Sequence, residues 1–141
     1  MKKTNGIENE IFKFIPGEIK NQLDRYIDSV IIPLLEAGEK TPIVEPQHWD
    51  LLIVLRYTGL RVQEVLHLIA EHVDKSKECL QYDLQENSKP YLNYCLLKKG
   101  GIPFMKISIS HLKDSSGRNM VERAILRQKD RVKTLPATSD G

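Results

Sequence analysis

Cysteine is scarce in this sequence of 141 residues, and its two copies, Cys79 and Cys95, form no C-x-x-C pair. No histidine stands near either one at a spacing typical of metal ligands, so a zinc site of the usual kind is excluded. A disulfide is not expected in a reducing compartment, and both residues are interpreted as small hydrophobic side chains. His67 and His72, five positions apart, are likewise read as structural or surface residues, and we expect no metal and no cofactor.

Long apolar runs are also lacking, because the longest stretch, around Leu51 to Leu55, is far shorter than a membrane span. The first ten residues contain no apolar region of a secretory signal, so we expect a cytoplasmic protein without a membrane partner. No glycine-rich phosphate loop and no Ser/His/Asp arrangement occurs. A composition of 40% hydrophobic and 28% charged residues predicts a folded, soluble chain.

The order of apolar patterns predicts the fold class. A first helix after Pro16 should be kinked or ended by Pro33 and closed by Gly38, and a buried second helix should run from Pro46 to Gly59. A short third helix should turn Val62, Val65, Leu66 and Ile69 inward. Three alternating segments then predict strands, namely Leu80 to Leu84, Tyr91 to Leu97 and Met105 to Ser110. A last helix, 119–133, should bury Val121, Ala124, Ile125 and Val132.

We therefore predict an α+β fold that is mainly helical and contains a three-stranded antiparallel meander. One unit is expected over residues 11–135, between flexible ends at 1–10 and 136–141.

The stretch with the most chemical content is YTGLRVQEVLHL, residues 57–68. A helix that ends at a glycine and is followed by another helix would hold Arg61 at a rigid corner, where its planar guanidinium could bind a phosphate. Glu64, three residues later, shares a helical face and could support that guanidinium. Taken alone, the R-x-x-E spacing is a weak signal that favours an ordinary surface ion pair between the two residues.

In context, this string resembles the arginine box of the tyrosine recombinase (phage integrase) family, and the chain is most similar to transposon-borne integrases. In that family the box precedes a three-stranded meander with a lysine between its second and third strands, and this sequence has LLKKGG there. The resemblance implies that Arg61 binds the scissile phosphate and that Glu64 supports the site. It also implies that Lys99, or less favourably Lys98, protonates the departing 5′ oxygen. A solvated turn is the other interpretation of the two lysines.

Other parts of the family's site do not occur here. None of the four histidines begins an H-x-x-R, and the last tyrosine, Tyr94, precedes the lysine turn. Without the nucleophile there is no covalent step, so we expect a truncated, partial catalytic domain that is inactive by itself and leave its status as an enzyme open.

A second candidate site lies in the last helix, where Arg123, Arg127 and Arg131 recur every four residues. They should form a stripe opposite the apolar face that could contact the DNA backbone, or an ordinary solvated surface. The expected function is DNA integration or recombination, with double-stranded DNA as partner. The alternative is a non-catalytic DNA-binding or interaction module, or a mobile-element remnant, that pairs with an intact recombinase or with itself.

Overall fold

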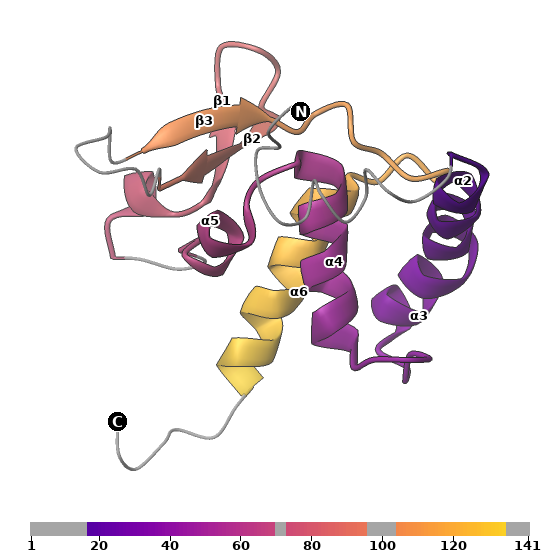
Figure 1. Cartoon of the computed structure of the whole chain (residues 1–141). Helices are drawn as coiled ribbons and strands as arrows, with labels where there is room; N and C mark the ends of the chain where they lie inside the picture. Colours follow the sequence, from indigo (N-terminus) through magenta and orange to yellow (C-terminus); the bar gives the residue numbers. More distant parts are fainter. Residues whose placement is uncertain (1–16, 70–72, 96–103, 135–141) are drawn as a thin grey trace, which may run out of the picture.

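The computed structural model describes residues 17–69, 73–95 and 104–134, and Figure 1 shows how their elements are arranged. The helical N-terminal segment lies on one side, two long helices run side by side through the middle, and a small sheet lies on the other side. The sheet has three antiparallel strands in the order β1-β2-β3. The α+β prediction with a three-stranded meander is therefore confirmed.

The elements follow one another with short connections. The helices are α2 (Gly17–Tyr26), the π-helical turn η1 (Ile27–Ile31), α3 (Ile32–Ala37), α4 (Pro46–Thr58), α5 (Val62–Leu66), the 3-10 turn η2 (Lys75–Lys77) and α6 (Met120–Thr134). The strands are β1 (Leu80–Asp83), β2 (Lys89–Tyr94) and β3 (Met105–Ser108). None of the helices in the described ranges is long and apolar enough to cross a lipid bilayer.

Of the two effects predicted for Pro33, a kink or the end of the helix, the end does not occur. The helix neither ends nor breaks there but continues to Ala37, and Gly38 closes it in the left-handed conformation at φ 72°. The π-helical turn η1 lies just before the proline, and the N–H of Ile32 donates to the carbonyl of Ile27. A proline lacks an N–H and crowds the preceding turn, and this wider turn accommodates it without ending the helix.

The core lies where α4 packs against α6 and both meet the inner face of the sheet. Trp49 and Ile53 of α4 and Val121 of α6 are buried, and Leu92 at the centre of β2 is fully buried. Leu92 pairs with Leu80 on one side and Ile107 on the other, so one sheet face is apolar. The core also contains the buried side chains Ile27, Ile31, Ile32, Leu35, Val54, Leu60, Val65, Cys79, Ile109, Met120, Ala124 and Ile125.

Three predicted core positions are wrong. Leu66 and Val132 are 57% and 55% exposed, and Leu84 lies in the turn after β1 with 86% of its surface exposed. Leu66 stands in the last turn of a helix of only five residues, and Val132 lies near the end of α6 beyond most of its packing partners. The apolar periodicity shows which face of an element a side chain occupies. It does not show whether a neighbouring element extends far enough to cover that side chain.

A network of ion pairs connects α6 to α3 and α4. Asp50 of α4 is only 3% exposed, and its two carboxylate oxygens accept hydrogen bonds from Arg127 at 2.6 Å and Arg131 at 2.5 Å. Glu36 of α3 accepts two hydrogen bonds from the guanidinium of Arg123, at 2.8 and 2.9 Å, and one from Arg127 at 2.5 Å. Arg127 therefore joins three helices through two carboxylates.

Replacing Asp50 should destabilise the fold strongly. In Asp50→Asn the buried guanidinium of Arg127 keeps Glu36 but loses one of its two carboxylate partners, which should cost about 1–3 kcal/mol. Urea denaturation should show this loss in the free energy of unfolding. The control Asp130→Asn removes an exposed carboxylate from α6, and it should change the free energy of unfolding by less than about 0.5 kcal/mol. Equal losses in the two variants would contradict the assignment of the network as the anchor of α6.

Glu36 should make stability depend on pH. The hydrogen bond from Arg123 holds the pKa of this carboxyl below its ordinary value of 4.5. A carboxyl with a lowered pKa stabilises the folded state above its ordinary pKa, and this contribution is lost as pH falls through the lowered value. The difference in unfolding free energy between the parent and Glu36→Gln should therefore shrink below about pH 4.5. Glu39→Gln, an exposed neighbour, should show no such convergence.

Candidate functional site

Arg61 stands at the corner between α4 and α5. Gly59 ends α4 in the left-handed conformation at φ 73°, and its N–H donates to the carbonyl of Leu55. Leu60 is buried, which anchors the corner in the core, and Arg61 follows in an extended conformation as the residue that precedes α5. The predicted helix–glycine–arginine–helix corner is therefore present, with Arg61 immediately outside the helix.

Glu64 holds the backbone of Arg61. Its side chain is buried, and its Oε1 accepts a hydrogen bond from the Arg61 N–H at 3.2 Å. This is the helix-capping role of an acidic residue in a first turn, where backbone N–H groups lack partners. The predicted support for the site thus acts on the main chain of Arg61.

The guanidinium of Arg61 is available to a ligand. The residue is exposed, and no ion pair to it occurs within residues 17–69, 73–95 and 104–134. The surface ion pair with Glu64 that the sequence left open is therefore absent among these residues.

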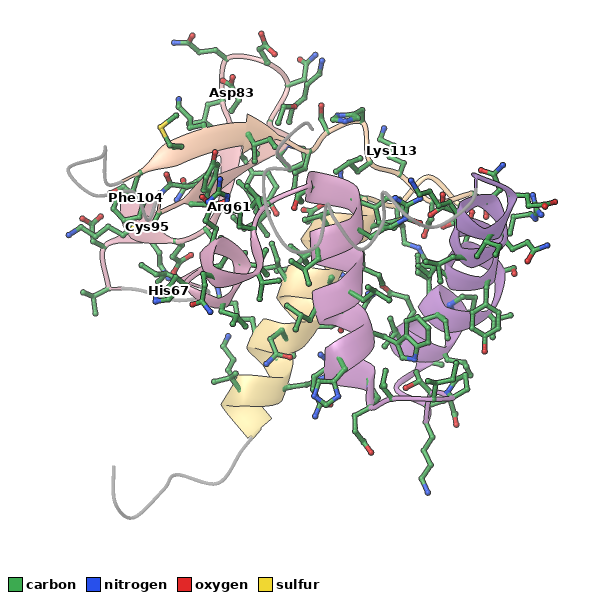
Figure 2. The ribbon with its side chains drawn as sticks, in the orientation of Figure 1. Arg61, His67, Asp83, Cys95, Phe104 and Lys113 are labelled. Atoms are coloured by element: carbon green, nitrogen blue, oxygen red, sulfur yellow. The ribbon has the colours of Figure 1, made fainter. Side chains whose placement is uncertain are left out.

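The end of the β2–β3 hairpin lies next to this corner. Figure 2 draws Arg61 close to Cys95 and Phe104, which flank the connector between the two strands. Burial and the nearby negative charge of Glu64 raise the pKa of Tyr94, the last residue of β2, which places the first turn of α5 close to this end. Lys98 and Lys99 belong to residues 96–103, which lie outside the described residues.

The arginine stripe of α6 is less exposed to solvent than predicted. Arg127 is buried, and the guanidinium groups of Arg123, Arg127 and Arg131 all hydrogen-bond to Glu36 or Asp50. The expectation that these residues lie opposite the apolar face is wrong, because the face they occupy packs against α3 and α4. Their guanidinium groups bind carboxylates inside the fold, and they are not part of the candidate DNA-contacting set.

Potential nucleophiles and metal ligands add little to this site. Burial raises the pKa of the Cys79 thiol to about 11, which disfavours the reactive thiolate. Burial and hydrogen bonds to carboxylates raise the pKa of Tyr57 and of Tyr82 above the ordinary value of 10. No cluster of three or more His, Cys, Asp or Glu side chains suited to a metal ion occurs in the part of the chain that the structure describes.

Two surface features lie outside the predicted site. One is an apolar groove of about 410 Å³ between α4, α5 and α6, lined by residues that include Leu51, Leu66, Ile125 and Val132. The other is a polar hollow of about 520 Å³, with Lys89 and Lys113 on its walls, at the start of β2 and of α6. The apolar side chains of the helices could have indicated the groove. The residues that line the hollow are far apart in the sequence, and no pattern connects them.

No protein-family model, curated protein or solved structure matches this chain.

Proposed function

We propose that this chain is a DNA-binding protein of the tyrosine recombinase type, with Arg61 in contact with a backbone phosphate. The main support is that Arg61 combines a fixed backbone with an exposed side chain. Its backbone is fixed by Glu64 and by the Gly59 corner, whereas its guanidinium is exposed and makes no ion pair among the described residues. Because the backbone of this arginine is already ordered, only its side chain loses freedom when its planar fork binds two phosphate oxygens.

The neighbouring hairpin supplies the second part of the proposed site. The connector that leaves β2 at Cys95 and returns at Phe104 contains Lys98 and Lys99. In the proposed function Arg61 and Lys99 both contact the phosphate, and Lys99 would donate a proton to a departing 5′ oxygen only where an intact recombinase supplies the nucleophile. Glu64 acts by positioning Arg61 and does not touch the DNA.

Cleavage is not proposed for these 141 residues by themselves. They contain no H-x-x-R, and a phosphoryl transition state that lacks one such cationic donor loses roughly 10²–10³ in rate. Tyr94, the tyrosine nearest the site, has a raised pKa and is therefore a poor nucleophile. The proposed activity of this chain is binding to duplex DNA through its phosphates.

Arg61→Ala should weaken DNA binding and reduce its dependence on salt. Removing one phosphate contact lowers the slope of log affinity against log salt by about 1 and the affinity roughly five- to tenfold near 0.15 M salt. Fluorescence anisotropy with a labelled duplex, at several salt concentrations, measures both quantities.

The matched control is Arg25→Ala, which removes the same charge from an exposed position on α2. It should bind like the parent. If Arg61→Ala and Arg25→Ala bind duplex DNA equally well, the proposed site is wrong.

A second candidate function is an interaction module that pairs with an intact recombinase, and the apolar groove favours it. Leu66 and Val132 on this groove are more than half exposed. An exposed apolar groove of this kind can receive the apolar face of a partner helix.

Leu66→Gln combined with Val132→Gln should abolish such pairing and leave the fold intact, because both side chains are largely exposed. Co-purification of the chain with a full-length tyrosine recombinase measures the pairing. Tyr82→Gln with Leu84→Gln changes two other exposed large side chains and should leave it unchanged. Failure of the parent chain to co-purify removes this candidate.

A further inference from the structure

A polar hollow lies at the opposite end of β2 from Arg61. It is formed where the β1–β2 turn meets the segment that joins β3 to α6 and the first turn of α6. Figure 2 shows Arg61 and Lys113 well apart. Because β2 runs from Lys89 to Tyr94, five residue steps of about 3.4 Å separate the two ends by roughly 17 Å.

Basic side chains from three separate parts of the chain meet on this hollow. Its lining includes Lys89, Lys113, Arg118 and Arg123, and the single carboxylate among its lining residues is Glu122. Asn87, Ser88 and Ser110 add amide and hydroxyl groups to the lining, whereas the side chain of Asn119 is hydrogen-bonded to the backbone of Ile109 and Glu122. Ammonium, guanidinium, hydroxyl and amide groups together are the donors that bind phosphate oxygens.

Two of the four basic side chains on the hollow already interact with carboxylates. Arg123 is hydrogen-bonded to Glu36, and Arg118 lies 3.8 Å from Glu36 and 3.9 Å from Asp114. Glu122 accepts a hydrogen bond from the Tyr82 hydroxyl at 2.5 Å. Lys89 and Lys113 are both exposed, and neither is in an ion pair with any carboxylate in the described ranges.

A hairpin turn lies at the edge of the hollow. Asn87 and Ser88 both have φ of 57°, the left-handed conformation that the two central residues of a tight hairpin turn adopt and that asparagine tolerates. This turn sets the point at which β2 begins, and Lys89 is its first residue.

We propose that this hollow is a second phosphate-binding site, in which Lys89 and Lys113 bind the anion. Two sources have the same chemistry: a phosphate of the DNA backbone and a free phosphate. The DNA source rests on the proposed function, whereas binding of free phosphate does not.

The first experiment uses inorganic phosphate and the full chain. Titration followed by amide chemical shifts should give saturable changes at Lys89 and Lys113. In Lys89→Gln/Lys113→Gln the affinity should fall at least about tenfold, because the two lost charged hydrogen bonds are together worth more than about 1.4 kcal/mol. Both lysines are exposed, so this variant should fold as the parent does.

The second experiment uses a labelled duplex at several salt concentrations. The double variant should lower the slope of log affinity against log salt by about 2, one for each lysine. The matched control is Lys40→Gln/Lys77→Gln, which removes two exposed charges elsewhere and should change neither measurement. Arg61→Ala should retain the affinity for inorganic phosphate at the hollow, so the two sites are tested independently.

The outcomes separate the sources. Loss of both phosphate and DNA affinity in the double variant, with the control unchanged, identifies a DNA phosphate as the ligand. Loss of phosphate affinity alone supports the site with a free phosphate as its ligand, whether or not Arg61 binds DNA. If the double variant matches the control in both experiments, the proposed site is wrong.

Discussion

The burial of Asp50 between two arginines is the constraint on which the architecture depends. Its carboxylate, on α4, holds Arg127 and Arg131 of α6, and Arg127 also reaches Glu36 on α3. These contacts join segments separated by 77 to 91 positions in the chain. They fix α6 against α4, and this helix pair in turn supports the sheet and the corner at Arg61.

The local features of the fold could be predicted because each has a cause within a few residues. Gly38 and Gly59 end helices in the left-handed conformation, and Pro46 stands in the first turn of α4, as the sequence indicated. The alternation around Leu92 and Ile107 predicted strands whose apolar side chains face the core. The corner that holds Arg61 depends only on such local signals, which is why the sequence located it.

The partners of distant charges could not be predicted in the same way. The spacing of Arg123, Arg127 and Arg131 showed that they share one helical face, but it did not show that Glu36 and Asp50 lie against that face. Glu64 was expected to support the guanidinium of Arg61, but its carboxylate binds the main-chain N–H of Arg61. A carboxylate three residues away can reach either group, so the spacing could not decide between them. Sequence spacing shows which side chains share a helical face, but the hydrogen-bond partners of those side chains depend on the three-dimensional fold.

The π-helical turn before Pro33 corrects the phase of a helix whose apolar residues are spaced too widely. Side chains four positions apart on an α-helix drift by about 40° at each step, because each residue advances about 100°. Ile27, Ile31 and Leu35 follow this spacing and are nevertheless all buried. The extra residue in the turn compensates for the accumulated drift, so deletion of a single residue here would rotate α2 relative to α3 and turn one of their apolar faces away from the core.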